Sequence, residues 1–206
     1  MKDIIAIDGP AGSGKSTVAR AVADALGWSF LDTGAMYRAL TAEVLRRGLD
    51  PRDVEAVAEI GATATITTVP RVVINGVDVE EIIRSEPVNV AVSAIAANPA
   101  VRRAMVTRQR AWAAAQPVGT VVEGRDIATV VFPDARLKVY LTASLDERAR
   151  RRGDEGVQSV ARRDSADRDR VASPLRQASD AVVIDTTDLS IDQVVEEIVR
   201  WLKTPN

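Results

Sequence analysis

Short apolar runs alternate along this chain with stretches of helical period, and this alternation predicts a layered α/β fold. Each run has four to six residues, a length typical of strands buried between helices. The helical stretches supply the crossovers that parallel strands require. We therefore expect a parallel five-stranded sheet flanked by helices. Its predicted strands are Ile4–Asp8, Ser29–Asp32, Thr120–Glu123, Leu137–Thr142 and Ala181–Asp185.

The helical stretches carry signals for their ends. Gly48 follows a helix that ends in two arginines, and Pro99 opens another helix. Two serines precede a Glu or Gln at the spacing of a capping box, in the pairs Ser144/Glu147 and Ser190/Gln193. The predicted helices are Ser16–Leu26, Ala35–Arg47, Pro99–Gln116, one that begins after Ser144, and Ile191–Leu202.

One region departs from the α/β alternation and predicts an inserted antiparallel subdomain over about residues 62–96. The dipeptide Asn75-Gly76 is a strong signal for a two-residue hairpin turn. Short strands are predicted at Thr65–Val69, Arg71–Ile74 and Val77–Val79.

A second irregular stretch, Arg148–Arg176, holds nine arginines and five acidic residues with few apolar ones. Two interpretations are open from the pattern alone. The stretch is a solvated surface segment, or it is a mobile lid whose arginines serve a site.

Composition excludes several classes of function. The 206 residues include no cysteine and no histidine, which excludes disulfides, zinc sites of the usual kind and serine–histidine triads. A formal net charge of −2 argues against a general nucleic-acid or membrane-surface binder. No apolar run is long enough to cross a bilayer, and the first residues do not resemble a signal peptide. We expect a soluble, cytoplasmic and monomeric protein.

The strongest motif is the phosphate-binding loop pattern G-x-x-x-x-G-K-[ST], the Walker A motif. It is formed by Gly9, Pro10, Ala11, Gly12, Ser13, Gly14, Lys15, Ser16 and Thr17, between a predicted strand and a predicted helix. Glycines let backbone N–H groups turn toward phosphate oxygens, and the following helix N-terminus adds positive potential. Lys15 is expected to reach the β- and γ-phosphates of a nucleoside triphosphate, and Ser16 to ligate Mg²⁺.

The rest of the sequence narrows the class of phosphate-loop protein. The chain has no N-K-x-D motif for reading guanine, and it is too short for a typical ATPase machine. Ligands in parallel α/β sheets bind beyond the carboxyl ends of strands. Two polar segments follow predicted strands there, Asp32–Arg38 and Glu123–Ile127. Together these features predict a phosphotransferase with a second substrate.

These motifs, with Asp167-Arg168-Asp169-Arg170, resemble those of bacterial cytidylate kinases. The resemblance covers nearly the whole chain and includes the insert. It implies a single nucleoside monophosphate kinase domain, with a core at 1–61 and 97–206, the insert at 62–96 and a short lid at about 148–170. It implies transfer of the γ-phosphoryl group of ATP to CMP or dCMP, with Mg²⁺.

The resemblance also implies roles for individual residues. Arg38, Arg125 and Arg170 would hold the acceptor phosphate, and Lys15, Arg125 and Arg170 would be catalytic. Ser93, Arg102 and Asp126 would read the cytosine, and Arg163 and Asp167 would contact the sugar and the region under the lid. Thr33 and Tyr37 complete the implied substrate-binding set.

The residue chemistry agrees with these roles. A carboxylate at Asp126 can accept from the N4 amine of cytosine but repels the O4 of uracil. The second pKa of a phosphate monoester is about 6, so no general base is needed at neutral pH. Arginine suits bidentate contact with phosphate.

Three departures from the family pattern stand out. Glu123 occupies a position where the family more often has Asp, Ala128 replaces a common glycine, and the lid is about ten residues shorter by resemblance.

Two alternative functions remain open. One is a small-molecule kinase with another acceptor, and the other is a non-catalytic nucleotide-responsive binding module.

Overall fold

The computed structural model describes residues 3–153, 156–169 and 173–204. The chain forms two compact units, one of Met1–Leu31 with Trp112–Asn206 and the other of Asp32–Ala111. Arg170 lies outside the described residues, and so does the side chain of Arg163. None of the described helices is both long enough and apolar enough to cross a membrane.

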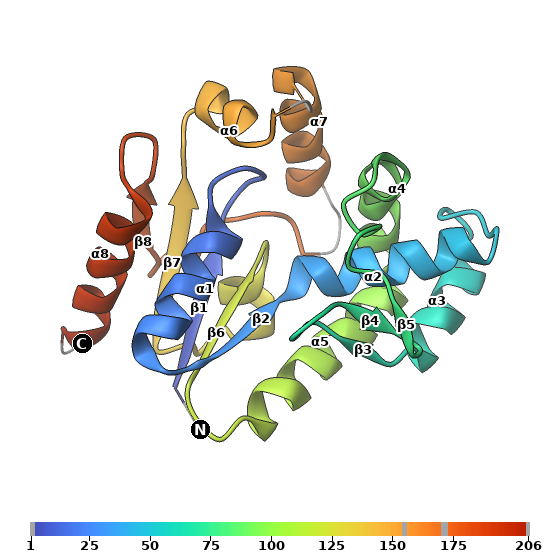
Figure 1. The fold of residues 1–206 in the computed structure, drawn as a ribbon, viewed down its shortest axis with the longest axis horizontal. Coiled ribbons are helices and arrows are strands. Elements are labelled where there is room, and N and C mark those ends of the chain that lie inside the picture. The colour runs from blue at the N-terminus through green and yellow to red at the C-terminus, as the bar shows by residue number, and fades with distance from the viewer. Residues whose placement is uncertain (1–2, 154–155, 170–172, 205–206) are drawn as a thin grey trace. The chain divides into compact units, whose positions relative to one another are not determined.

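The first unit contains the predicted five-stranded parallel sheet (Figure 1). Its strand order is β2-β6-β1-β7-β8, and β1 pairs in parallel with both β6 and β7. The strands are β1 (Ile4–Asp8), β2 (Ser29–Asp32), β6 (Thr120–Gly124), β7 (Leu137–Thr142) and β8 (Val182–Asp185). The sequence prediction is confirmed for all five, with β6 ending one residue later and β8 beginning one residue later than expected.

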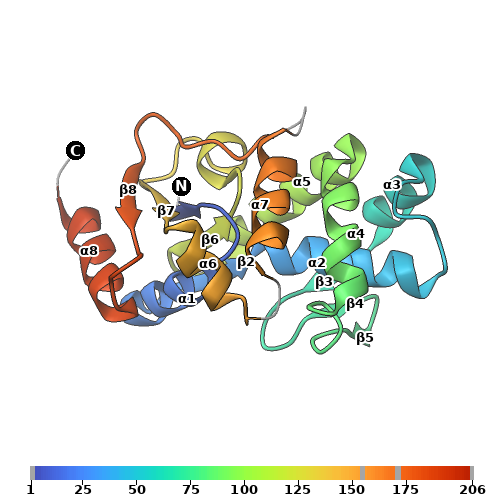
Figure 2. The same cartoon turned by 90° about the horizontal axis from the view of Figure 1, so that it is seen from above.

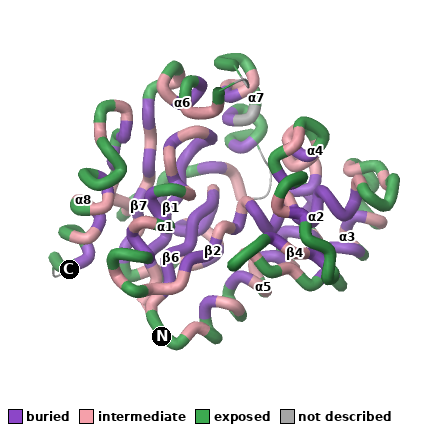
Figure 3. Tube along the Cα trace, in the orientation of Figure 1, coloured by how far each residue is buried: buried purple, intermediate pink, exposed green. Residues whose placement is uncertain are grey.

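One face of this sheet is covered by α1 (Lys15–Leu26) and α8 (Ile191–Lys203), which share an apolar core with the strands. Ile5 and Ile7 of β1 are completely buried in that core, and Figure 3 shows β1 and β6 as buried along most of their length. The π-helical segment η1 (Ile127–Val131) follows β6 and contacts both β1 and β6. The central strands are therefore buried on both faces, as a parallel sheet requires.

Of the two predicted capping boxes, the one at α8 forms fully and the one at α6 (Leu145–Arg151) forms only in part. The Ser190–Gln193 capping box is present at α8. At α6 the Ser144 side chain accepts from Glu147 N, but the Glu147 carboxylate binds Arg150 and Arg151 instead of returning to the cap. Only half of the expected box forms, because two neighbouring arginines compete for the same carboxylate.

The interpretation of residues 148–176 as a solvated segment is right only in part, because many of the described residues are exposed but several are buried. α6 and α7 (Gly156–Arg168) occupy it, and Figure 2 shows these helices side by side. Arg148, Asp164 and Asp167 in these helices are buried. Sequence pattern missed this burial because the charged side chains are satisfied by each other and by backbone groups.

The second unit is mainly helical. It contains the predicted antiparallel strands, but they are shorter than expected, and a helix occupies the last part of the region 62–96 that was predicted as the insert. The helices of the second unit are α2 (Thr33–Arg46), α3 (Val54–Thr63), α4 (Glu86–Ala97) and the greater part of α5 (Pro99–Ala115). Its small sheet has the order β3-β4-β5, with β3 at Ile66–Thr67, β4 at Val73–Ile74 and β5 at Val77–Asp78. α2 begins two residues earlier than predicted because Asp32 caps it by accepting from Ala35 N.

The hairpin turn in the insert forms as predicted. Asn75 and Gly76 both have positive φ, at 50° and 79°, as a type I′ turn requires. The Asn75 side chain donates to Glu43 of α2 at 3.3 Å, and Arg46 and Arg47 also donate to Glu43. The Glu43 side chain is 1% exposed. Hydrogen bonds from Arg46, with further ones from Arg47 and Asn75, lower the pKa of Glu43 to about 2.

We expect Glu43→Gln to lower the free energy of unfolding at pH 7 by about 1.5–3 kcal/mol, because buried hydrogen bonds to a charged group are lost. Since the folded pKa lies below the ordinary value, this stabilisation is present above about pH 4.5 and disappears as the pH falls toward 2. Urea unfolding of both proteins across this range measures it. A difference independent of pH would contradict the role of the Glu43 charge.

Candidate active site

The phosphate loop, Gly9–Thr17, connects β1 to α1 at the carboxyl end of the sheet. Two positions of the loop must be glycine, because backbone atoms of other segments lie too close to leave room for a side chain. A Cβ atom on Gly9 would lie 2.1 Å from Leu141 O, and one on Gly12 would lie 2.6 Å from Arg148 O. Gly12 also has a φ of 77°, which side chains disfavour. The loop is therefore packed into the unit rather than exposed as a flexible turn.

Lys15 is buried at the start of α1, and its ammonium turns back across the loop. Nζ donates to Pro10 O at 2.7 Å and contacts Ser13 Oγ at 3.4 Å. Burial lowers the pKa of Lys15 to about 7, and the nearby guanidinium of Arg125 acts in the same direction. Negative charge on Glu123 and Asp167 opposes that shift. The ammonium is thus held where the charge of a bound phosphate would stabilise it.

Glu123, at the end of β6, lies next to the predicted metal ligand. Ser16 Oγ donates to Glu123 Oε1 at 2.6 Å, and Glu123 is 3% exposed. A hydroxyl and a carboxylate are oxygen ligands of the kind that Mg²⁺ prefers, so the pair fits such an ion. The sequence singled out Ser16 alone for the metal. It placed Glu123 in the polar segment at a strand end and noted its departure from Asp, but gave it no metal role. The position of Glu123 at the end of a predicted strand was the sequence feature that could have indicated a role at the metal site.

Arg125 and Asp167, two of the predicted substrate-binding residues, form an ion pair in the first unit. Arg125 Nε donates to Asp167 Oδ2 at 2.7 Å. Burial acts to lower the pKa of Arg125, but the carboxylates of Asp167, Glu123 and Asp164 act together against burial, and the pKa is raised above its ordinary value. Arg125 therefore remains a cation in this site, with its guanidinium oriented by a residue of α7.

A second buried pair fastens α6 and α7 to the phosphate loop. Arg148 Nη1 donates to Asp164 Oδ2 at 2.5 Å and to Ala11 O at 3.1 Å. Ala11 N in turn donates to Asp164 Oδ1 at 3.3 Å. Each member of the pair thus contacts one polar group of the same loop residue. The sequence placed Arg148 in the lid without a definite role and did not single out Asp164.

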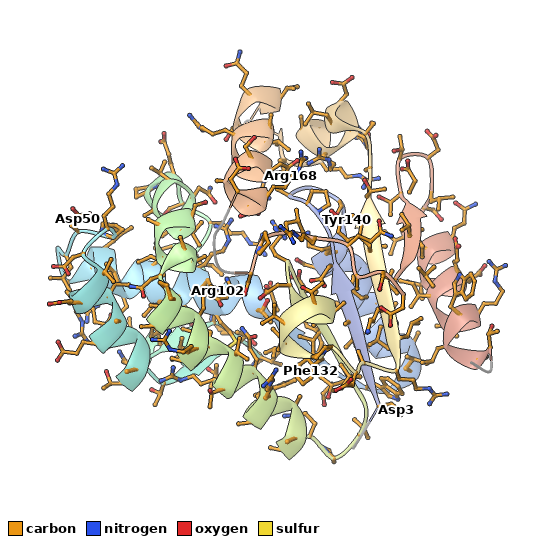
Figure 4. The ribbon with its side chains drawn as sticks, turned by 180° about the vertical axis from the view of Figure 1, so that it is seen from behind. Asp3, Asp50, Arg102, Phe132, Tyr140 and Arg168 are labelled. Atoms are coloured by element: carbon orange, nitrogen blue, oxygen red, sulfur yellow. The ribbon has the colours of Figure 1, made fainter. Side chains whose placement is uncertain are left out.

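Arg151 joins the same loop to the segment after β8. Its guanidinium donates to Thr186 Oγ1 at 2.8 Å and to Thr186 O at 2.6 Å. The Thr186 hydroxyl lies 3.2 Å from Ser13 O. Figure 4 shows Tyr140 and Arg168 toward one end of this unit and Asp3, which precedes β1, toward the other. The charged groups collect at the carboxyl ends of the strands, where the sequence predicted a ligand site.

The second unit contains three other predicted residues, and two of them, Arg102 and Tyr37, are in contact. Arg38 Nη1 donates to Ile83 O at 2.8 Å and to Asn89 Oδ1 at 2.7 Å. The Arg102 guanidinium lies over the Tyr37 ring, 5.7 Å from its centroid. Of the remaining predicted residues, Asp126 in the first unit is buried, Thr33 of α2 is buried, and Ser93 of α4 is half-buried.

Comparisons with known proteins add to this geometry. The sequence profile of a family described as cytidylate kinase matches residues 5–204. This chain belongs to the cytidylate kinase family. Two relatives named cytidylate kinase are 47% identical (Geobacillus kaustophilus) and 46% identical (Mycolicibacterium paratuberculosis), over 95% of this chain and 94% and 92% of their own lengths. A bifunctional pantoate ligase/cytidylate kinase of Synechocystis is 48% identical over 98% of this chain but only 43% of its own length.

Solved structures agree at the level of fold. A shikimate kinase from Acinetobacter baumannii has a TM-score of 0.51 at 15% identity, with coverage of 98% of this chain and 93% of that one. A protein from Thermus thermophilus has a TM-score of 0.53 at 20% identity and covers 99% of both chains. The predicted family and fold class are confirmed.

We expect Asp164→Ala to lower the free energy of unfolding by about 3–5 kcal/mol, because it leaves the Arg148 cation buried without its partner. Urea unfolding measures this effect. Asp169→Ala, at an exposed position near the end of the same helix, is the matched control and should change stability by less than about 0.5 kcal/mol. Equal effects of the two variants would contradict the role of the buried pair.

Proposed function

We propose that this chain transfers the γ-phosphoryl group of ATP to CMP or dCMP, giving ADP and CDP or dCDP. The observation that carries the proposal is the buried cluster around the phosphate loop, where Lys15, the Ser16–Glu123 pair and the Arg125–Asp167 pair lie within electrostatic range of one another. Membership of the cytidylate kinase family supports the choice of acceptor.

The donor nucleotide would bind through the phosphate loop. Backbone N–H groups of the loop and the N-terminus of α1 would hold the phosphates, and Lys15 would neutralise charge on the transferred group. Ser16 and Glu123 would hold Mg²⁺, which when bound supplies further neutralisation of phosphate charge.

The acceptor would be held mainly by arginines. Its phosphate would contact Arg38, Arg125 and Arg170, and an acceptor oxygen that is already ionised at neutral pH needs no general base. Catalysis would then depend on positioning and on stabilisation of charge in the transition state. Since Asp167 orients Arg125, its contact with the sugar would be a second role of the same carboxylate.

The remaining assignments stay predictions. Ser93, Arg102 and Asp126 would read cytosine, Arg163 would contact the sugar region, and Thr33 and Tyr37 would line the acceptor site. The division into core, insert and lid, the monomeric state and the cytoplasmic location are likewise carried over from the sequence. Lid closure over bound ATP would exclude water and suppress hydrolysis.

We expect Arg125→Lys to lower kcat/KM for CMP by about 10²-fold or more, although it keeps the positive charge. An ammonium cannot donate to Asp167 and to a phosphate with the planar fork of a guanidinium. Steady-state kinetics of the Lys and Ala variants measure this. If the Lys variant works nearly as well as wild type, Arg125 acts only as a surface charge.

We expect Asp126→Asn to lower the ratio of kcat/KM for CMP to that for UMP by about tenfold or more. The variant loses a hydrogen bond between a charged group and cytosine N4, worth about 1.5–3 kcal/mol, and its amide can donate to uracil O4. Kinetics with both nucleotides decide the matter. Proportional loss for both acceptors would remove Asp126 from the base-reading site.

A further inference from the structure

Asp8, the last residue of β1, makes contacts that the donor and acceptor roles above do not use. It is 1% exposed, and its two carboxylate oxygens each accept one backbone N–H bond. Oδ1 accepts from Ile127 N at 2.9 Å, and Oδ2 accepts from Ala128 N at 2.8 Å. Both bonds cross from the strand before the phosphate loop to the segment after β6.

These two N–H groups open the π-helical segment Ile127–Val131, where a helix has no partners of its own for its first donors. Asp126 occupies the cap position, but its side chain makes no capping hydrogen bond. Asp8 therefore acts as the cap from a neighbouring strand. A single carboxylate satisfies two adjacent donors, which fixes both the position and the direction of this backbone.

The segment held in this way begins directly after Arg125 and Asp126. In the β1–β6 ladder Asp8 lies opposite Gly124, so the strands fix the backbone before Arg125 while the carboxylate fixes it after Asp126. The two residues are thus restrained from both sides.

Keeping a carboxylate here has an energetic cost. Desolvation raises the pKa of Asp8 to about 6. The two N–H bonds and the charge of Lys15 counteract that shift, while the charge of Asp126 adds to it. Among residues of similar size, Asn would avoid the charge but could accept only one of the two N–H bonds. The retained carboxylate is consistent with a demand for both acceptor oxygens.

We propose that Asp8 is a positioning residue for the acceptor site, which sets the orientation of Arg125 and Asp126 by capping the segment that follows them. The inference rests on the proposed function, since it assumes that these two residues contact the acceptor. Asp8 itself touches neither nucleotide in this account. Its charge also acts on Lys15, but its hydrogen bonds go to the segment after β6, so a substitution should affect acceptor use more than donor binding.

The test compares Asp8→Asn with wild type in three measurements. KM for CMP should rise by about tenfold, and the CMP:UMP ratio of kcat/KM should fall at least threefold. The Kd of a fluorescent ATP analogue, measured without acceptor, should change by less than about threefold. Unchanged acceptor kinetics, or equal losses for the ATP analogue and for CMP, would overturn the proposal.

A variant at another buried carboxylate serves as the control for a general loss of stability. Glu43→Gln also removes a buried carboxylate that accepts several hydrogen bonds, and it should lower Tm without changing the CMP:UMP ratio. If Asp8→Asn does not fold, Asp8→Glu decides the question. It keeps both acceptor oxygens but shifts them by one methylene, so it should give the same selective rise in KM for CMP. Wild-type acceptor kinetics in a folded Glu variant would contradict the proposal.

Asp126→Asn, assayed in parallel, separates this inference from the function on which it rests. If that variant changes the CMP:UMP ratio and Asp8→Asn leaves both the ratio and KM for CMP unchanged, the Asp8 proposal fails alone. If Asp126→Asn leaves the ratio unchanged, the base-reading role fails, and a selective rise in KM for CMP in Asp8→Asn still supports positioning of Arg125.

Discussion

The buried ammonium of Lys15 is a charge that other groups of the first unit have to stabilise. A cation removed from water needs negative partners, and its pKa of about 7 reflects how far burial works against its charge. Glu123 and Asp167 supply that compensation from β6 and α7, while the loop carbonyl of Pro10 accepts from the ammonium. A triphosphate bound at the loop would add negative charge at the point where the cation is least stable.

Each of these carboxylates also accepts a hydrogen bond from a second partner. Glu123 accepts from Ser16, and Asp167 accepts from Arg125. Asp164 contacts Ala11 of the loop as well as Arg148. The arginines on α6 and after β6 are therefore held by carboxylates that also lie close to the phosphate loop.

The sequence predicted the parts that depend on local pattern. The limits of the five parallel strands followed from apolar runs to within one residue, whereas the strands of the insert are shorter than predicted. The phosphate loop followed from its glycines and lysine, and the hairpin from Asn75-Gly76. It did not predict Arg148 and Asp164 as a buried pair, because burial of charge depends on partners distant in sequence. Asp8 was visible as an acid ending an apolar strand, but its contact with the segment after β6 depends on strand order, which no local pattern specifies.

The central claim is that this phosphate-loop cluster serves transfer to a cytidine monophosphate. Release of ADP from ATP, assayed with CMP, dCMP, UMP, AMP and GMP and without any acceptor, tests that claim most directly. The account predicts the highest kcat/KM for CMP or dCMP, with little ADP formed when no acceptor is present. Preference for AMP or GMP, or ADP release that does not depend on any monophosphate, would contradict it.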